Sequence, residues 1–303
     1  MGTAPLDCLI VGGGPAGLTA ALYLARFNRR FALVDSGASR AAWIPSSHNF
    51  PVFSSGVAGP DMLARQREHV ARYGVTPIAG TVTALEKTGG RFQATVHGAP
   101  GVTHLAARTV LLATGALDIE PELPQLADAL RRGLLRYCPI CDGYEARGRR
   151  VAVIGYGDRG LGEAVFMART YSHDVTLLTL GQTLRMSPAQ QRQVTEHRIK
   201  MVADPIEQLD VEGDRITAIR IGGAEYVFET LYSALGLRVR SELAVALGAE
   251  HDEVGALTVD AHNQTTVSGL YAAGDTVRGL NQIVVAMGHA ATAATAIHNI
   301  CEV

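Results

Sequence analysis

The chain has 303 residues, which is enough for two domains of about 150 residues each. Hydrophobic residues make up 47% of it and charged residues 18%, a composition typical of a globular protein with a sizeable core. The formal net charge is -2, so the chain has no cationic field that would attract a polyanion. We therefore expect no nucleic-acid partner.

The amino-terminal residues lack the basic region and the small-residue cleavage site of a secretory signal. Apolar stretches elsewhere are broken by Gly, Thr or charged residues well short of the ~18 residues that are needed to span a bilayer. These two features predict a cytoplasmic protein without a membrane partner.

The first structural unit is a strand, a glycine loop, a helix and a second strand. The strand covers residues 6–11, the loop Gly-Gly-Gly-Pro-Ala-Gly covers 12–17, the helix covers 18–26 and the second strand covers 31–34. A Gly-x-Gly-x-x-Gly loop between a strand and a helix is the fingerprint of a dinucleotide-binding fold. This unit therefore predicts a nucleotide site at the loop.

Each glycine of this loop has a physical role in such a fold. Gly12 permits the tight turn, Gly14 lets the backbone approach a pyrophosphate, and Gly17 allows the helix to pack closely on the sheet. The free N–H groups of the helix amino terminus favour phosphate. Asp35 ends the second strand, 18 residues after Gly17, where a carboxylate can accept a hydrogen bond from a ribose hydroxyl.

The residues that follow this first unit form a loop and a hairpin. Residues 36–60 are rich in Ser, Ala, Gly and Pro and include His48, which is either a catalytic base or a solvated loop residue. Strands at 81–85 and 91–96 flank Gly89-Gly90 as a hairpin. An apolar strand then ends in Ala-Thr-Gly at 113–115, and we place a domain boundary near residue 117.

Two of the four cysteines form a Cys-x-x-Cys motif, Cys138-Pro-Ile-Cys141. A zinc site would need a second close pair of Cys or His ligands, and none follows, so redox use is favoured. The carboxyl group of the adjacent Asp142 is placed to move the protons of a disulfide cycle. Cys8 lies within an apolar strand as a core residue, and Cys301 is expected to be a partly exposed thiol.

A second dinucleotide fingerprint follows the cysteine pair, with a strand at 150–154, a glycine loop, a helix at 162–171 and a strand at 174–180. The glycines of this loop are Gly155, Gly157 and Gly160. The residues after its second strand, 179–182, offer neither an acid for a ribose hydroxyl nor an arginine cluster for a 2′-phosphate. The domain therefore either binds a nicotinamide nucleotide or has lost or changed its ligand.

The carboxyl-terminal part begins with a small-residue strand that ends in Gly274-Asp275, where the backbone can approach a ligand and a carboxylate can accept from ribitol hydroxyls. A helix is predicted from about residue 282 to 300. The predicted fold is α/β, with two Rossmann-like three-layer domains, the second inserted in the first. The domain ranges are 1–117 and 242–303 for the outer domain and 118–241 for the inserted one.

These motifs together resemble the low-molecular-weight thioredoxin reductase family of flavoproteins. The residues that carry the resemblance are the loop 12–17, Asn49-Phe50-Pro51, Ala113-Thr114-Gly115, residues 138–143, residues 155–158, and residues 269–275 with Gln282. They occur in the family's order and cover essentially the whole chain.

The resemblance implies a homodimer with FAD in the outer domain and a disulfide against the flavin ring. By position, Cys141 would be the flavin-side thiol, Cys138 the interchange thiol and Asp142 the general acid/base. The positions expected to hold cofactor in the outer domain are Gly12, Gly14, Pro15, Ala16, Gly17, Asp35, Asn49, Val82, Thr114, Gly115, Gly274, Asp275, Gln282 and Ile283. Those in the inserted domain are Gly155, Gly157 and Gly160.

The sequence departs from the family where NADPH is recognised. Thr179-Leu180-Gly181-Gln182 replaces the family's His-Arg-Arg type cluster, with only Arg185 close by, and Asn281-Gln282 replaces its Arg-Gln pair. The loop from Trp43 to His48 also differs from the Gly-Gly-Gln-Leu stretch that is usual in the family. These departures resemble offshoots of the family that are ferredoxin-linked, hold a second flavin, or oxidise the dithiols of small metabolites.

The expected function is that of an FAD-dependent disulfide or dithiol oxidoreductase. It would move electrons between flavin and a protein or small-molecule disulfide through Cys138 and Cys141. NADPH and a route without pyridine nucleotide stay open as electron partners. Two alternatives stay open as well: a dithiol oxidase that passes electrons to oxygen, and a flavin-bound redox sensor without turnover.

Overall fold

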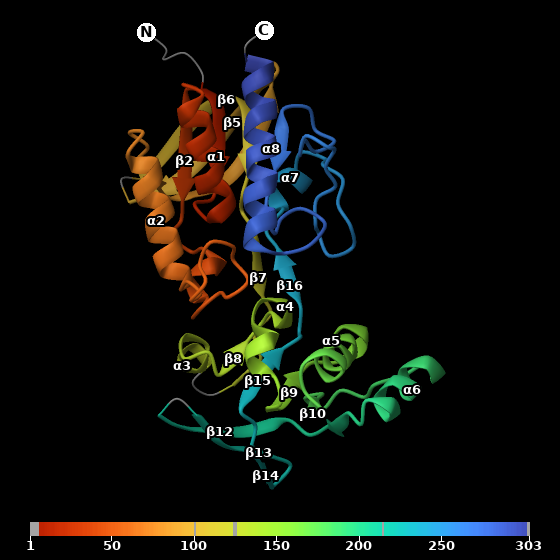
Figure 1. Ribbon diagram of the computed structural model, residues 1–303. Coiled ribbons are helices and arrows are strands. Elements are labelled where there is room, and N and C mark those ends of the chain that lie inside the picture. The colour runs from red at the N-terminus through yellow and green to blue at the C-terminus, as the bar shows by residue number, and fades with distance from the viewer. Residues whose placement is uncertain (1–5, 100, 124–125, 214, 302–303) are drawn as a thin grey trace. The chain divides into compact units, whose positions relative to one another are not determined.

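The structure, a computed structural model, describes residues 6–99, 101–123, 126–213 and 215–301 (Figure 1). The chain divides into two compact units. Unit 1 comprises Met1–Ala42, Ala58–Leu117 and Arg238–Val303, and unit 2 comprises Trp43–Val57 and Asp118–Leu237. Unit 1 is therefore discontinuous, with most of unit 2 inserted into it.

These units differ in two places from the ranges expected from sequence. The chain returns to unit 1 after Leu237, whereas the expected inserted domain continued to residue 241. The segment Trp43–Val57 groups with unit 2, although it lies within the range 1–117 that was expected for the outer domain. The reason is its contacts: Pro45 lies near Gly133, and Asn49 bonds to Ile140, both in unit 2.

Unit 1 is built on a sheet in which β1 (Leu6–Val11) lies between β2 (Phe31–Asp35) and β6 (Gly101–Leu112), parallel to both. The long strand β6 also pairs with the antiparallel hairpin β4–β5 and with the parallel strand β17. The remaining strands are β3 (Ile78–Ala79), β4 (Thr81–Thr88), β5 (Arg91–Gly98) and β17 (Leu270–Ala272). The order is β3-β2-β1-β6-β5-β4, with β17 on β6.

The helices of unit 1 include α1 (Pro15–Arg26), α2 (Gly59–Ala71), α7 (Glu242–Val245) and α8 (Ile283–Cys301), and the 3-10 turn η1 (Arg40–Trp43) follows β2. Helix α1 contacts both α2 and α8 (Figure 1). It begins at Pro15, three residues earlier than the predicted helix, because a proline at the first helical position fits the turn and needs no N–H partner.

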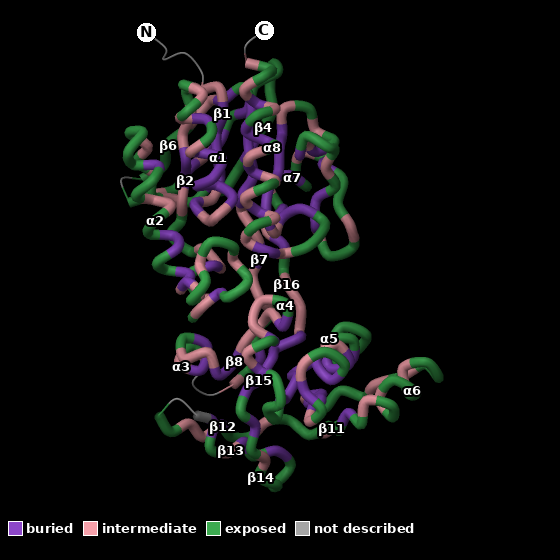
Figure 2. Tube along the Cα trace, in the orientation of Figure 1, coloured by how far each residue is buried: buried purple, intermediate pink, exposed green. Residues whose placement is uncertain are grey.

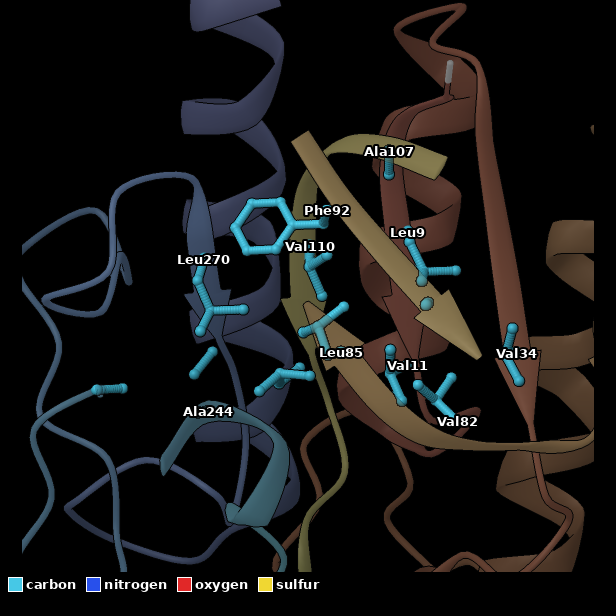
Figure 3. Packing of buried hydrophobic residues seen from close by; sticks show 14 of the residues in the cluster. Leu9, Val11, Val34, Val82, Leu85, Phe92, Ala107, Val110, Ala244 and Leu270 are labelled. Atoms are coloured by element: carbon cyan, nitrogen blue, oxygen red, sulfur yellow. The ribbon is translucent and has the colours of Figure 1, made fainter. Parts of the chain in front are cut away.

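The core of unit 1 lies where the parallel strands meet the hairpin (Figure 3). Phe92 on β5, Val110 on β6 and Leu270 on β17 are all buried there. Buried positions follow the strands and the inner faces of the helices, while the outer faces are exposed (Figure 2). This packing fixes the ends of β1, β6 and β17, which carry the glycine motifs.

Unit 2 is built on a parallel sheet in the order β11-β10-β9-β15-β8. Its strands are β8 (Leu135–Arg136), β9 (Arg150–Ile154), β10 (Asp174–Leu178), β11 (Lys200–Val202) and β15 (Thr230–Ser233). The first crossover helix, α5 (Gly157–Thr170), begins five residues before the predicted one, because the last glycines of the loop form its first turn.

Both faces of this sheet are covered, which makes unit 2 a three-layer structure. Val151 and Val153 face a cluster with α5, whereas Ala152 and Ile154 face a cluster with Leu130 of α3 and the strands of a small meander. The covering elements are α3 (Leu126–Arg131), α6 (Pro188–Glu196), β12 (Ile206–Glu212), β13 (Arg215–Ile221) and β14 (Ala224–Tyr226). The short elements α4 (Pro139–Asp142) and η2 (Gly143–Ala146) precede β9, and β7 (Ala116–Asp118) pairs with β16 (Leu237–Val239).

Helix α8 corrects one expectation from the sequence. It has 19 residues with a mean hydropathy of 1.3, so among the described helices it is long and apolar enough, by length and composition, to cross a membrane. The sequence-based expectation was that apolar stretches stop well short of that length. A row of small residues on α8, including Ala286, Ala290 and Ala293, is buried, and the helix contacts α1, as a core helix does.

The core of unit 1 gives the first testable prediction. Replacing Phe92, which is 1% exposed, by alanine leaves a cavity between the hairpin and β17, and we expect a loss of about 3–5 kcal/mol in the free energy of unfolding. The matched control is Val102→Ala on the neighbouring strand, because Val102 is 55% exposed. Chemical denaturation measures both, and equal losses in the two variants would contradict this packing.

Candidate functional site

The first glycine loop leaves no room for side chains at two positions. Gly12 has a φ of 108°, and a Cβ there would collide with the carbonyl of Ala113. A Cβ at Gly17 would collide with the carbonyl of Gly12. The start of α1 therefore packs directly on the ends of β1 and β6, as a dinucleotide-binding loop requires.

The amino terminus of α1 is suited to a phosphate group. Gly14 caps it in an extended conformation, no side chain caps the free N–H groups, and the first turn contains no acidic residue. A Cβ at Gly14 would approach only the hydroxyl of Ser39, at 3.2 Å. Open N–H groups and the helix dipole together favour an anion at this position.

Asp35 lies beside this loop at the end of β2. Its Oδ1 accepts hydrogen bonds from the N–H groups of Gly13 and Gly37, at 3.2 and 3.0 Å. Its Oδ2 lies 3.5 Å from the guanidinium of Arg67, a neighbour that the sequence analysis did not single out. The carboxylate is thus fixed by the backbone, with Oδ2 as the oxygen that has capacity for a ribose hydroxyl.

The other cofactor positions expected in unit 1 lie at the ends of β6 and β17. Thr114 donates its hydroxyl hydrogen to the carbonyl of Arg240, and Gly115 has a φ of 69°. Gly274, with a φ of 79°, would place a Cβ against Ala16 of α1. The carboxylate of Asp275 pairs with Arg40 at 3.2 Å, and Arg40 is a second residue that the sequence analysis did not single out.

Three expected positions have different surroundings. Val82 is buried in β4, and Ile283 is the first residue of α8, directly after the buried Gln282. Asn49 belongs to the segment that groups with unit 2, where its side-chain amide donates to the carbonyl of Ile140 at 3.4 Å. The structure thus ties Asn49 to the cysteine turn.

The cysteine pair of unit 2 forms a disulfide, with 5.3 Å between the Cα atoms of Cys138 and Cys141. Cys138 caps the short helix α4, and its carbonyl accepts from the N–H groups of Cys141 and Asp142. Both cysteines are half-buried, whereas Ile140 between them is 51% exposed. The turn therefore holds the disulfide near the surface of the unit.

The carboxyl group of Asp142 is held by partners on two neighbouring strands, β15 and β8. The hydroxyl of Tyr232 on β15 donates to Oδ1 at 2.9 Å, and Arg136 on β8 lies 3.6 Å from Oδ2. Burial raises the pKa of Asp142, while the Arg136 charge and the Tyr232 hydrogen bond oppose that rise. Asp142 is thus a carboxyl group whose proton is held more tightly than usual, directly after the flavin-side cysteine expected from sequence.

The residues next to this turn fix its position. A Cβ at Gly143 would collide with the ring of Tyr171 at the end of α5, so only glycine fits. His48 bonds to the hydroxyl of Ser46 at 3.1 Å, and its charge lowers the pKa of Asp142. His48, considered as a possible base from sequence, is therefore an electrostatic neighbour of Asp142.

A second carboxyl group, with one buried oxygen, lies on α5. Oε1 of Glu163 is buried and has no hydrogen-bond partner within the described part of the chain. Burial raises the pKa of Glu163 to about 8, the Arg159 charge opposes this, and the Asp142 charge raises it further. The sequence analysis missed Glu163, Tyr232 and Arg136, since none belongs to a motif.

The second glycine loop is packed as tightly as the first. A Cβ at Gly155 would lie 2.9 Å from the Cα of Gly160 and 3.0 Å from Ala234, so α5 and β15 approach the end of β9 closely. Gly157 has a φ of 61° and nothing within 4 Å of an added Cβ, which leaves its backbone open to a ligand.

No group of three or more His, Cys, Asp or Glu residues that could hold a metal ion occurs among the described residues.

Comparisons with known proteins agree with this site. The pyridine nucleotide-disulphide oxidoreductase family model matches residues 6–290. A thioredoxin reductase of Streptomyces coelicolor is 32% identical over 95% of this chain and 91% of its own length. The chain belongs to the pyridine nucleotide-disulphide oxidoreductase family.

Solved structures of similar proteins share the fold. The thioredoxin reductase of Streptococcus pyogenes superposes with a TM-score of 0.90 at 25% identity, with 99% of both chains covered. HlmI superposes with a TM-score of 0.87 at 29% identity, over 98% of this chain and 95% of its own. These matches confirm the predicted α/β fold with two Rossmann-like domains, and the chain is a flavin-dependent disulfide oxidoreductase resembling thioredoxin reductase.

The end of β10 is followed by a turn at the four residues 179–182. Thr179 donates its hydroxyl hydrogen to the carbonyl of Gln182, and Leu180 and Gly181 have φ angles of 54° and 82°. The four residues thus form a tight turn without a basic side chain. Arg185 is exposed shortly after it, where a guanidinium could approach a nucleotide phosphate.

The hydrogen bond between Tyr232 and Asp142 gives a second prediction. The Tyr232→Phe change removes a donor to the ionised carboxyl, so the pKa of Asp142 should rise further. The free energy of unfolding at neutral pH should fall by about 1–2 kcal/mol. A group whose folded-state pKa is raised contributes stability at low pH that is lost as pH rises. The deficit should therefore grow as pH rises through the raised folded-state pKa of Asp142, where its carboxyl group ionises.

Denaturant titrations at several pH values measure this deficit in the oxidoreductase. The control is Tyr226→Phe, because the ring of Tyr226 stacks on the ring of Phe228. A Tyr232→Phe deficit that is the same at every pH would contradict a role of the hydroxyl in holding the Asp142 charge.

Proposed function

We propose that the enzyme moves an electron pair between FAD and a disulfide- or dithiol-bearing protein or small molecule through Cys138 and Cys141. The observation that supports this most is the position of Asp142, a half-buried carboxyl group with a raised pKa directly after a half-buried Cys-x-x-Cys disulfide. A thiolate is the nucleophile in disulfide exchange, and an acid nearby can protonate the sulfur that leaves.

In the reductive direction, the proposed cycle begins with reduction of the enzyme disulfide. An electron pair breaks the S–S bond between Cys138 and Cys141, and two protons complete the two thiols. The Cys138 thiolate then attacks an external disulfide, forms a mixed disulfide and expels one thiolate, which takes a proton. The Cys141 thiolate attacks the Cys138 sulfur, restores the disulfide and releases the second product thiol. Asp142 transfers protons at the leaving sulfur in both stages.

The residues of unit 1 fit FAD as the electron carrier. The cradle formed by Gly12, Gly14 and Gly17 and the open amino terminus of α1 would hold the pyrophosphate, and Asp35 would hold a ribose. Gly274 and Asp275 offer backbone and a carboxylate for the ribitol chain. Bound flavin supplies the electron pair or accepts it, and the protein supplies position and proton transfer.

The assignment of the units follows from this proposal. The outer part, expected as 1–117 and 242–303, would be the FAD domain, and the inserted part would carry the disulfide and the second nucleotide loop. That loop, with Gly155, Gly157 and Gly160, would hold NADPH or a second flavin. By analogy with relatives named thioredoxin reductases, we infer a cytoplasmic homodimer that acts on a disulfide partner such as thioredoxin.

The turn at the end of β10 favours a second candidate, a dithiol oxidase. Residues 179–182 give a 2′-phosphate no cationic partner, and Arg185 is the nearest guanidinium along the chain. If no pyridine nucleotide delivers electrons, the flow would run from a substrate dithiol through the cysteine pair to flavin and on to oxygen. Both candidates use the same Cys138, Cys141 and Asp142.

Anaerobic mixing with nicotinamide nucleotides tests the proposed donor site. We expect the flavin absorbance to bleach with NADH and NADPH at apparent affinities within about threefold, because the missing charge-assisted hydrogen bonds would otherwise favour NADPH. The change Leu180→Arg should create a preference for NADPH, and Leu180→Gln is the matched control, because it places a polar side chain without charge at the same position. A tenfold preference of the unchanged enzyme for NADPH would contradict this view of the turn.

Bleaching by neither nucleotide, combined with oxygen consumption on addition of a dithiol, would favour the oxidase. Absence of both bleaching and dithiol or disulfide turnover would reject the proposed function in both forms.

A further inference from the structure

Residues 47–57 form a closed surface loop beside the cysteine turn. The N–H groups of Ser47 and Val57 each donate to the other residue's carbonyl, at 2.8 and 3.1 Å, and both residues are buried. Between them, the rings of Phe50 and Phe53 stack with their centroids 5.4 Å apart. A loop with close ends and packed side chains of its own is compact, and such loops are frequently functional.

One polar contact fixes this loop on the cysteine turn. The side-chain amide of Asn49 donates to the carbonyl of Ile140, at 3.4 Å, and Ile140 is part of the Cys-x-x-Cys motif itself. Val52 follows Asn49 by three residues, so the Cα atoms of these two residues lie within about 11 Å of each other. The tip of the loop is therefore held close to the disulfide within unit 2.

The tip of the loop carries a strained and exposed valine. Val52 has a φ of 73° and is 94% exposed. Five residues other than glycine have a positive φ in the described part of the chain, and Val52 is the β-branched one among them. A β-branched side chain is strongly disfavoured in that conformation, because it crowds the backbone. Val52 therefore costs stability and buries almost no apolar surface in return.

A partner protein fits this surface better than a small molecule does. Small-molecule sites are concave and enclose most of their ligand, whereas the side chain of Val52 has almost no protein around it. Ile140 in the cysteine turn is 51% exposed as well. Single exposed apolar residues are common on proteins, but backbone strain at such a residue is not. An apolar tip of this kind is buried when a second protein surface covers it.

We propose that Val52 is a specificity-determining residue, which contacts a protein partner that carries apolar side chains next to its reactive cysteines. This contact would hold the partner while its disulfide or dithiol reacts with Cys138 and Cys141. The bond changes are those of the proposed exchange, and Val52 takes no part in them. The inference rests on the proposed function, and it selects a protein as the substrate class.

The test compares wild type with Val52→Gly in a single turnover. The holoenzyme is reduced with dithiothreitol, freed of it under argon and mixed with excess oxidised thioredoxin, or with insulin if thioredoxin does not react. Quenched alkylation and mass measurement count the free cysteines of the enzyme. The half-saturating concentration of the protein disulfide should rise by about tenfold in the variant, because an apolar contact is lost. The limiting rate, and the rate with the small disulfide cystamine, should not change.

The same change should make the protein more stable. Glycine adopts a positive φ without strain, so the melting temperature of Val52→Gly should rise by about 2–4 °C. The matched control is Val254→Gly, because Val254 in the described part of unit 1 is 62% exposed and is not among the residues with positive φ. The control should change neither the half-saturating concentration nor, in the upward direction, the melting temperature.

The change Val52→Thr separates the apolar contact from the shape of the loop. Threonine keeps the branched Cβ and hence the strain, but it replaces a methyl group by a hydroxyl group. Its half-saturating concentration should rise by about threefold at an unchanged melting temperature.

A wild-type half-saturating concentration in either Val52 variant would overturn the inference, and so would an equal effect on cystamine and on the protein disulfide. A melting temperature that does not rise in Val52→Gly would overturn it by removing the strain. Reaction of the wild type with cystamine but with neither protein would overturn it too. Failure of the wild type with all three disulfides would count against the proposed function instead.

Discussion

The proposed chemistry depends on a conflict between burial and charge at Asp142. The carboxyl group lies in the turn that closes the disulfide, where burial favours its protonated form, while Arg136 and Tyr232 favour its ionised form. Burial outweighs the other two effects and raises the pKa of Asp142, while the Arg136 charge and the Tyr232 hydrogen bond limit that rise. A group balanced in this way can release and accept a proton in one catalytic cycle.

The fold produces this balance by strand pairing over long distances in sequence. Tyr232 reaches Asp142 because β15 pairs with both β9 and β8, which places the end of β15 beside the cysteine turn. Arg136 is on β8 itself, in register with Tyr232. The alternation of Val151 and Val153 with Ala152 and Ile154 buries both faces of the same sheet. The packing of this sheet therefore positions Tyr232 and Arg136 beside Asp142. The Cys-x-x-Cys motif alone does not supply these two partners.

The sequence predicted those features that depend on residues close together in the chain. The glycine loops, the hairpin around Gly89-Gly90 and the cysteine pair were recognisable because each is a local pattern. Glu163, Tyr232 and Arg136 were not, because their roles arise only when separate strands and helices meet. The grouping of Trp43–Val57 with unit 2 was missed for the same reason, since its contacts with residues 133 and 140 are nonlocal.

In the two glycine loops, the residues that close packing requires differ from the residues that select the ligand. Gly12 and Gly17 are required by backbone contacts within unit 1, and Gly155 and Gly160 by similar contacts within unit 2. These contacts preserve the shape of a dinucleotide site whatever the ligand is. The choice of ligand depends on side chains at the strand ends, where β2 provides Asp35 and β10 is followed by a turn without charge.

The most direct test of the central role of Asp142 is the change Asp142→Asn, which keeps the size and the hydrogen-bond acceptor for Tyr232 but removes the exchangeable proton. Its rate of disulfide exchange should fall by about 100-fold at pH 7, while the Cys138–Cys141 disulfide still forms. An Asp142→Asn enzyme that exchanges disulfides at the wild-type rate would contradict the account.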